Sequence, residues 1–261
     1  MEAITSKENS RYKQLCKLVS SKKERQKTGL FVAEGLRLCC DAVRSGMIPE
    51  SIFATEHFVK KFPDEWQQLT AQCARQYLIT EELSEKISDT QTPQGVFAVF
   101  AALDKTVNTG KIEYGRFLFL VSLQDPGNVG TIIRTAEALG ISGVLMTSDC
   151  PDVYSPKVLR STMGSLFRLP IYNVENPIEL VRDFQQKGFS VYAAALRNDS
   201  VKLGTVSFPE KAMVLIGNEA NGLPQEVISA CDKVLMIPMK GNAESLNAAS
   251  AANIIMWEMM K

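Results

Sequence analysis

The second half of this chain contains five short apolar segments, and the residues between them have the spacing of amphipathic helices. The apolar segments are residues 117–123, 143–147, 191–196, 212–216 and 234–237. Strands that alternate with helices favour a parallel sheet, because each helix carries the chain back to the edge where the next strand begins. Segments that are apolar throughout also favour burial on both faces of the sheet. The sequence therefore predicts an α/β fold with a mostly parallel sheet covered by helices.

The first hundred residues predict a second, smaller α/β domain. Strand candidates alternate there with helical patterns, and a length of 261 residues suits two modest domains. The strand candidates are residues 29–35, 51–54, 77–79 and 96–100, and the helical patterns are 12–18, 36–43, 65–74 and 81–87. Polar residues then interrupt the apolar pattern. We therefore expect a domain at 1–104, a linker at 105–115 and a second domain at 116–261.

The charges are distributed unevenly along the chain. The first 30 residues hold eight Lys or Arg against three Glu, whereas the remainder holds 21 basic against 26 acidic residues. A basic segment on an acidic protein attracts polyanions, because phosphate contacts release counterions. The same residues can also form the solvated face of a helix. The charge pattern is thus compatible with nucleic-acid binding without establishing it.

The cysteines and the single histidine indicate whether the protein can bind a metal, and the cysteines also indicate its cellular compartment. None of the six cysteines has CxxC spacing, and His57 lies in the first domain, so we expect no metal site. Cysteines this sparse are typical of reduced thiols, which favours the cytoplasm. The chain begins without an apolar targeting segment, and its longest apolar run, residues 96–103, is too short to cross a bilayer. We therefore expect a cytoplasmic protein that does not bind membranes.

Three loops of the second half carry the residues that we expect to bind a ligand. Ligands of open parallel sheets bind beyond the carboxyl ends of the strands, so the loops that follow strands are the informative ones. Polar residues and glycines occur at 124–128 after the first strand, at 217–224 after the fourth and at 238–247 after the fifth. The sequence predicts that these three loops form one site.

Gly217 and Gly222 enclose a polar turn in the second of these loops. Because glycine lacks a Cβ and accepts positive φ, the backbone of this turn can approach a ligand and bind the edge of an adenine. The turn can equally be an ordinary connection from strand to helix, with Pro224 in the first turn of that helix. Both interpretations stay open at this point.

The third loop contains two candidate contact residues. Ser245 stands where a helix should begin, so its hydroxyl can simply cap the first backbone amides. Asn247 is expected one turn into the same helix, where asparagine is unfavourable. That position favours a specific polar contact for Asn247.

Arg134 lies on a helix that we expect to begin near Thr131. Its simplest role is an ion pair with Glu137, three residues further on, which stabilises a helix only slightly. Alternatively, a guanidinium close to the start of a helix can bind a phosphate with two parallel hydrogen bonds.

Taken together, the three loops carry ordered motifs that resemble those of the SpoU/TrmH branch of the SPOUT RNA methyltransferases. The first motif consists of Asn128, Gly130, Arg134 and Gly140, the second spans residues 216–224, and the third spans residues 237–251. The resemblance covers about residues 117–261. The first hundred residues, and 31–38 above all, resemble the ribosomal-protein-like substrate-binding domain that often precedes this family's catalytic domain.

The resemblance implies a fold and an activity. The fold is an α/β domain whose C-terminal part is tied in a trefoil knot, and a homodimer completes the site. The implied activity is methylation of a ribose 2′-oxygen in structured RNA, with S-adenosylmethionine as the methyl donor. Ribosomal RNA is favoured over transfer RNA because of the resemblance of the first domain.

The resemblance also assigns roles to individual residues. Those implied to bind the cofactor are Leu196, Gly217, Asn218, Ile237, Met239 and Leu246. Those implied to surround the reacting ribose are Asn128, Arg134, Glu219, Ser245 and Asn247. Because a guanidinium titrates above about 12, we expect Arg134 to anchor a phosphate and stabilise charge rather than act as a base. We expect the RNA phosphate or Glu219 to assist proton removal.

Three alternatives are compatible with the same residues. The activity can be directed to transfer RNA, or the scaffold can bind RNA without catalysing a reaction. A nicotinamide-linked oxidoreductase is the third, because Gly127 and Gly130 follow a strand and Asp149 ends the next one. The glycine spacing argues against this reading, since Ile132 and Ile133 stand where a third glycine is needed.

Overall fold

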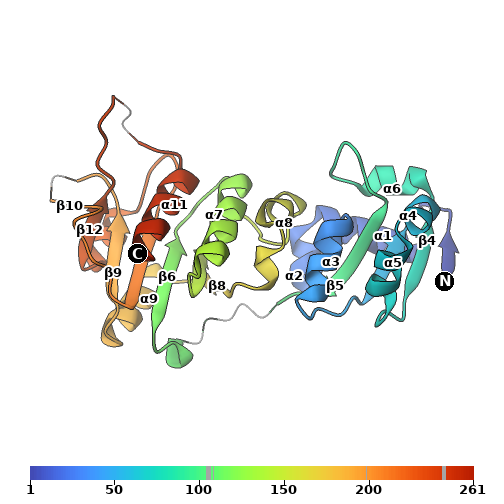
Figure 1. Ribbon diagram of the computed structural model, residues 1–261, viewed down its shortest axis with the longest axis horizontal. Coiled ribbons are helices and arrows are strands. Elements are labelled where there is room, and N and C mark those ends of the chain that lie inside the picture. The colour runs from blue at the N-terminus through green and yellow to red at the C-terminus, as the bar shows by residue number, and fades with distance from the viewer. Residues whose placement is uncertain (104–106, 108, 198, 243–244) are drawn as a thin grey trace. The chain divides into compact units, whose positions relative to one another are not determined.

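The structure is a computed structural model that describes residues 1–103, 107, 109–197, 199–242 and 245–261. Contacts among its residues divide the chain into two compact units (Figure 1). The first comprises Met1–Asp104 and Asp152–Phe167, and the second comprises Lys105–Pro151 and Arg168–Lys261. The second half of the chain thus contributes one segment, residues 152–167, to the first unit.

The first unit is built on a five-stranded mixed sheet. The strand order is β1 (Glu2–Ile4), β4 (Gln76–Ile79), β3 (Ser51–Ala54), β5 (Val96–Ala101) and β2 (Leu30–Glu34). The first three strands of this order pair in parallel, and β5 runs antiparallel to both β3 and β2. Four of these strands were expected from the sequence. Only β1 was missed, because three residues are too few for a period-2 pattern to show.

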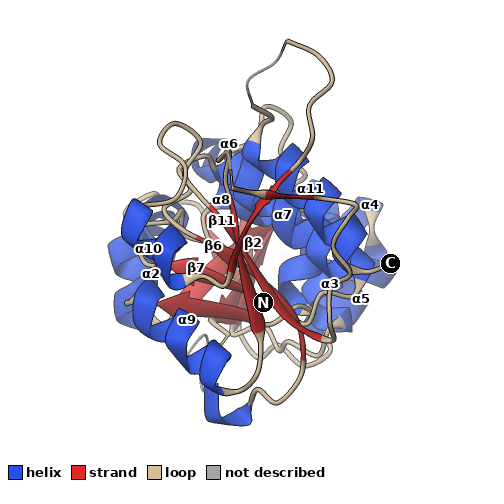
Figure 2. Ribbon diagram, turned by 90° about the vertical axis from the view of Figure 1, so that its left-hand side faces the viewer, coloured by secondary structure: helices blue, strands red, loops and turns tan. Residues whose placement is uncertain are grey.

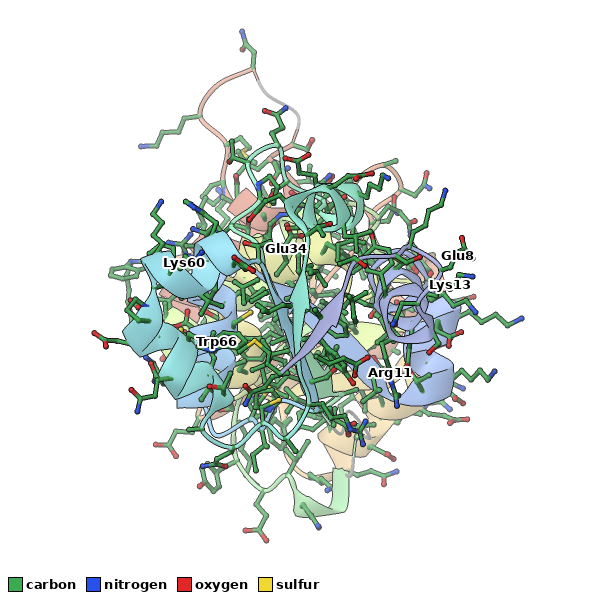
Figure 3. The ribbon with its side chains drawn as sticks, turned by 90° about the vertical axis from the view of Figure 1, so that its right-hand side faces the viewer. Glu8, Arg11, Lys13, Glu34, Lys60 and Trp66 are labelled. Carbon is green, nitrogen blue, oxygen red and sulfur yellow. The ribbon has the colours of Figure 1, made fainter. Side chains whose placement is uncertain are left out.

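Helices cover this sheet. They are α1 (Ser10–Ser20), α2 (Lys22–Thr28), α3 (Leu36–Arg44), α4 (Glu56–Lys61), α5 (Pro63–Thr70), α6 (Glu81–Ile87) and α8 (Pro156–Thr162), with a 3₁₀ turn η2 (Ser165–Phe167). The helix starts follow from capping, since Asn9 accepts the first amides of α1 and Thr80 accepts one at α6. Arg11 and Lys13 point outward from α1, whereas Trp66 is turned toward the sheet (Figure 3).

Several contacts hold segment 152–167 in the first unit, and two of them involve buried or stacked side chains. Asp152 accepts a hydrogen bond of 2.7 Å from Nε of the buried Arg25, whose Nη1 also donates to the carbonyl of Leu18. Tyr154 stacks on Phe31 with their ring centroids 4.5 Å apart. Sequence reasoning placed this segment with the second half of the chain, because such contacts leave no local pattern. The expected division into a domain at 1–104, a linker at 105–115 and a domain at 116–261 stays a prediction.

The second unit contains a seven-stranded sheet in which every pairing is parallel. The strand order is β10 (Val201–Lys202), β12 (Lys233–Met236), β9 (Ser190–Ala194), β11 (Lys211–Ile216), β6 (Gly115–Leu120), β7 (Gly143–Thr147) and β8 (Ile171–Val174). The predicted α/β fold class is confirmed. The short β10 and β8 were not expected from the sequence.

Helices lie on both faces of this sheet. They are α7 (Pro126–Leu139), α9 (Pro177–Gln186), α10 (Gln225–Ala230) and α11 (Ala248–Met259), and a 3₁₀ turn η1 (Thr109–Lys111) precedes β6. Phe184 of α9 and Val227 of α10 share a core with Phe117 and Phe119 of β6. The helices α7 and α11 lie side by side on the opposite face (Figures 1 and 2).

The strand order places a switch point between β6 and β11. From β6 the chain moves outward through β7 and β8, and later strands fill the other side of β6. The loops that follow β6 and β11 therefore leave the same edge of the sheet next to one another. Crevices of this kind are where open parallel sheets bind ligands.

The cysteines are unpaired, as their spacing predicts: Cys16, Cys39, Cys40, Cys73, Cys150 and Cys231 are all free thiols. Burial raises the pKa of the Cys150 thiol, so it stays protonated and unreactive near neutral pH. No helix formed by the described residues is long and apolar enough to cross a membrane.

Candidate functional site

A cavity of about 470 Å³ lies beyond the carboxyl ends of β9, β11 and β12. All six residues that the sequence assigned to cofactor binding line this cavity: Leu196, Gly217, Asn218, Ile237, Met239 and Leu246. A volume of this size is typical of sites for small molecules. The structure therefore brings together residues from three segments that are far apart in the sequence.

Most of the residues that line the cavity are apolar, and backbone groups contribute polar surface between them. Leu196 and Leu246 line it although they are 57% and 37% exposed, which is unusual for large apolar side chains. Among the described residues of the lining, Arg197 and Glu219 are the only charged ones. An apolar cavity with a few placed polar groups fits a flat, partly apolar ligand such as an adenosine derivative.

The turn 217–222 is closed by its own hydrogen bonds. The backbone amide of Asn218 donates to the carbonyl of Gly222 at 3.0 Å, and the amide of Gly222 donates to the carbonyl of Asn218 at 2.9 Å. The side chain of Asn218 donates to the carbonyl of Ser122 at 2.8 Å and so ties this turn to the loop after β6. Gly222 has a φ of +67°, the left-handed conformation that favours glycine.

Gly217 is required for a different reason. A Cβ at this position would lie 2.3 Å from the carbonyl carbon of Gly222 and 2.4 Å from the amide nitrogen of Leu223. Both atoms belong to the backbone, so neither can turn aside as a side chain does. From the sequence, we expected the missing Cβ to let a ligand approach the backbone. In the structure, the missing Cβ instead lets the backbone of Gly222 and Leu223 pack against Gly217, which shapes the wall of the cavity.

Glu219 joins this turn to the start of α7. Its Oε2 accepts the amide of Gln124 at 3.0 Å, and its Oε1 accepts the amide of Asp125 at 3.2 Å and Nδ2 of Asn128 at 2.9 Å. Burial acts to raise the pKa of Glu219, but the hydrogen bond from Asn128 and the backbone amides outweigh it, so the pKa lies below its ordinary value. A carboxylate with a lowered pKa is a weak base. The geometry thus favours a positioning role for Glu219 over the proton removal considered from the sequence.

We expect Glu219→Gln to lower the free energy of unfolding by about 1 kcal/mol, because the amide nitrogen of glutamine cannot accept the hydrogen bonds that the carboxylate accepts. Partial exposure of the site to solvent keeps the effect this small. The pKa of Glu219 is lowered from 4.5, so its stabilisation is present above pH 4.5 and is lost as the pH falls through the lowered value. The difference between the two proteins should therefore be constant near neutral pH and shrink in acid, as measured by urea unfolding. A matched control is Glu226→Gln on the exposed face of α10, and an equal effect there would contradict the assignment.

Asn128 and Asn247 link the first and third loops. Nδ2 of Asn247 donates to Oδ1 of Asn128 at 3.0 Å, which brings the N-terminal ends of α7 and α11 together. Asn247 is itself the N-cap of α11, since its Oδ1 accepts the amides of Ala249 and Ser250. The expectation that Asn247 lies inside the helix and that Ser245 begins it was wrong. An asparagine fits the cap better because its side chain satisfies amides that have no partner in the helix.

Arg134 and Ser245 differ in their relation to the cavity. Ser245 lines it, whereas Arg134 does not and lies on the exposed side of α7. Glu137, the expected partner of Arg134, accepts hydrogen bonds from Nε and Nη2 of Arg168 at 2.9 and 3.3 Å instead. No hydrogen bond or ion pair holds the guanidinium of Arg134 to any described residue. It is therefore available to a ligand.

The geometry counts against the nicotinamide alternative. The cavity lies at the ends of β9, β11 and β12 rather than at the glycines that open α7. Asp149, the expected ribose ligand, accepts a hydrogen bond from the hydroxyl of Thr147. A dinucleotide site needs the pyrophosphate at the glycine turn and the acidic residue facing the same crevice.

Sequence reasoning missed three residues of the site. Asp125 caps α7, because its side chain accepts a hydrogen bond from the amide of Asn128 at 2.8 Å. The helix therefore begins at Pro126 and not near Thr131 as expected. The Asp-Pro pair in the sequence was the signal that could have predicted this start. Ser122 has a left-handed φ of 55° and donates its amide to Thr147 Oγ1, which no local pattern predicts. Arg197 lines the cavity one residue beyond Leu196.

Two known protein families match this chain, one in each half of the sequence. Residues 115–257 match the model of the SpoU rRNA methylase family, and residues 9–98 match that of the MRM3-like substrate binding domain. A similar curated protein is the 23S rRNA (guanosine(2553)-2'-O)-methyltransferase RlmP of Bacillus subtilis (strain 168). It is 32% identical over 99% of this chain and 99% of its own length.

Two solved structures resemble the whole chain. One is the AdoMet bound rRNA methyltransferase from Sinorhizobium meliloti, which is 30% identical and superposes with a TM-score of 0.86 over 99% of this chain and 97% of its own. The other is the SpoU methyltransferase AviRb from Streptomyces viridochromogenes in complex with the cofactor AdoMet. It is 28% identical, with a TM-score of 0.83 over 97% of each chain.

Proposed function

Because the chain belongs to the SpoU rRNA methylase family, we propose that it transfers the methyl group of S-adenosylmethionine to a ribose 2′-oxygen in ribosomal RNA. The observation that carries this proposal is the cavity at the ends of β9, β11 and β12, next to the linked side chains of Asn128, Glu219 and Asn247. The relatives named as rRNA 2'-O-methyltransferases and the AdoMet-bound structures support the same donor and acceptor.

The residues present fit S-adenosylmethionine. The cavity has the volume that an adenosine needs, most of the residues that line it are apolar, and the turn at Gly217 forms part of its wall. Leu196, Ile237 and Leu246 would hold the adenosine, with Met239 beside them. When bound, the cofactor supplies a methyl group on a positively charged sulfur.

The protein's own residues have two tasks, because a ribose hydroxyl is a weak nucleophile near neutral pH. The first task is alignment, which Asn128 and Asn247 serve by fixing the ends of α7 and α11 at the site. The second is to stabilise negative charge on the ribose oxygen, for which the positive ends of the same two helices and the guanidinium of Arg134 are suited. Glu219 holds the loops in place, so proton removal falls to a group of the substrate, such as its phosphate.

Ribosomal RNA is favoured over transfer RNA as the substrate, because relatives that match this chain through the first unit are named as rRNA methyltransferases. The first unit matches a substrate binding domain, and seven of the eight Lys and Arg among its first 30 residues are exposed. The eighth, Arg25, is buried against Asp152 and serves the fold. Labelled methyl transfer from S-adenosylmethionine to purified ribosomal RNA tests the proposal. A protein that binds this RNA but leaves it unlabelled would instead be a non-catalytic RNA-binding protein, and preferential labelling of transfer RNA would favour the second substrate.

We further propose that the active form is a homodimer. Ile254 and Trp257 on the outer side of α11 are 42% and 59% exposed, an unusual exposure for large apolar residues. The exposed Arg134 lies on the adjacent helix α7, outside the cavity of its own chain. A second copy packed on α7 and α11 would cover the apolar side chains and place its arginine at the first chain's site.

Trp257→Glu is expected to convert the dimer to a monomer in sedimentation velocity, raising the dissociation constant at least ~30-fold because a buried interface tryptophan is often a hot spot. The matched control is Tyr114→Glu, which changes an aromatic residue that is 75% exposed near the start of β6. A Trp257→Glu protein that sediments like the unmodified one would exclude this face as the interface.

Three expectations from the sequence stay predictions. They are the trefoil knot, the absence of a metal from the reaction and the cytoplasmic location. The six free thiols support the cytoplasm, and the described residues contain no group of three or more metal-binding side chains.

A further inference from the structure

Arg197 occupies a specific place in the cavity wall. It is the third residue after the end of β9 and the neighbour of Leu196 in the sequence. Among the described residues that line the cavity, it is the one cation. Its loop is held by backbone and side-chain bonds, since the amide of Arg197 donates to Oγ of Ser200 at 3.1 Å and the amide of Ser200 donates to the carbonyl of Arg197 at 3.2 Å. These hydrogen bonds fix the backbone of Arg197 at the rim of the cavity.

The guanidinium of Arg197 is bound on one side only. Its Nε donates to Oδ1 of Asp199 at 3.0 Å, and its Nη2 donates to Oδ2 at 3.2 Å. This pairing leaves the N–H groups of Nη1 and the second N–H of Nη2 without a partner from Asp199. Together they can donate two parallel hydrogen bonds to another carboxylate. Arg197 can thus hold a second carboxylate while Asp199 fixes the plane of its guanidinium.

The charges of the cavity define where a carboxylate can bind. The amino-acid end of S-adenosylmethionine carries one carboxylate and one ammonium group, and the sulfur beside it is positively charged. Glu219, on the loop after β11, repels a carboxylate and attracts both cationic groups. Arg197, on the loop after the neighbouring strand β9, has the opposite preference.

We propose that Arg197 binds the α-carboxylate of the cofactor through its Nη1 and Nη2 atoms and so determines affinity for the amino-acid end of that ligand. This inference rests on the proposed function, since it assumes that the cavity binds S-adenosylmethionine. Asp199 is the positioning residue for this contact. An RNA phosphate is the other anion that such a group can bind, but Arg197 lines the same cavity as Leu196 and Leu246, which favours the cofactor.

The test measures binding rather than turnover. Isothermal titration calorimetry on the full chain would compare S-adenosylhomocysteine, which has the carboxylate, with 5′-methylthioadenosine, which lacks the whole amino-acid end. We expect Arg197→Ala to weaken S-adenosylhomocysteine roughly tenfold and methylthioadenosine less than about twofold, because one charge-assisted contact at a partly exposed site is lost. Arg197→Lys should recover part of the loss, since lysine keeps the charge without the fork.

Arg182→Ala on α9 is the matched control, because Arg182 is also exposed and is not in the cavity lining. Equal weakening of both ligands by Arg197→Ala, or weakening of neither, would overturn the proposal. Unchanged S-adenosylhomocysteine binding together with weaker ribosomal RNA binding would assign Arg197 to a phosphate instead. If the unmodified protein binds neither ligand, the proposed function itself fails, and that outcome is separate from the others.

Discussion

Arg134→Ala is expected to reduce the single-turnover rate of methyl transfer by about 10³-fold, because a charged donor at the reacting group is lost. The affinity for S-adenosylmethionine should not change, since Arg134 does not line the cavity. Its side chain is exposed and no described residue binds it, so the substitution should leave the free energy of unfolding unchanged. Rapid-quench kinetics with labelled cofactor and calorimetry on the same protein separate these effects.

Arg134→Lys separates charge from geometry. If Arg134 anchors a phosphate mainly by its charge, lysine should recover at least about tenfold of the lost rate. A rate that is equally low for lysine and alanine would mean that the two-pronged geometry is essential. A rate near that of the unmodified protein for the alanine variant would remove Arg134 from the reaction.

Gly217→Ala is expected to weaken S-adenosylmethionine binding at least ~100-fold and to lower the free energy of unfolding by about 2 kcal/mol, because the added methyl group overpacks a backbone turn. The Cβ would lie 2.3 Å from the carbonyl carbon of Gly222, and only a movement of the turn can relieve this contact. Such a movement displaces Asn218 and Glu219, which connect the cavity wall to the loop after β6. Calorimetry and urea unfolding measure the two effects.

Gly241→Ala provides the matched control for Gly217→Ala. Gly241 lies in the loop after β12, and a Cβ there would meet no atom within 4 Å. The control variant should bind the cofactor as the unmodified protein does. If Gly217→Ala also binds normally, the turn is more adaptable than its hydrogen bonds indicate, and Gly217 has no special role in the cavity.

The individual roles within the site required the structure. The motifs named Asn128, Glu219 and Asn247 as neighbours of a reacting ribose, but they did not show that Asn128 binds both of the others. Glu219 was considered as a proton acceptor, whereas its bonds to three N–H donors and its lowered pKa make it a weak base. Asn247 was expected inside α11 and is its cap. Sequence patterns report which residues cluster, and hydrogen-bond geometry decides what each of them does.

What the sequence determined by itself is the class of the fold, and it also named six residues that line one cavity. Apolar strands that alternate with helical segments specify a parallel sheet, because the local pattern of apolar residues determines which segments are buried. Parallel strands all run in the same direction, so the polar loops that follow them leave the same edge of the sheet. The tertiary structure alone decided the pairing of Asn128 with Glu219 across 91 positions and with Asn247 across 119, and the packing of residues 152–167 in the first unit. These contacts join residues that are distant in the chain, and they depend on where folded segments meet rather than on the residues next to them.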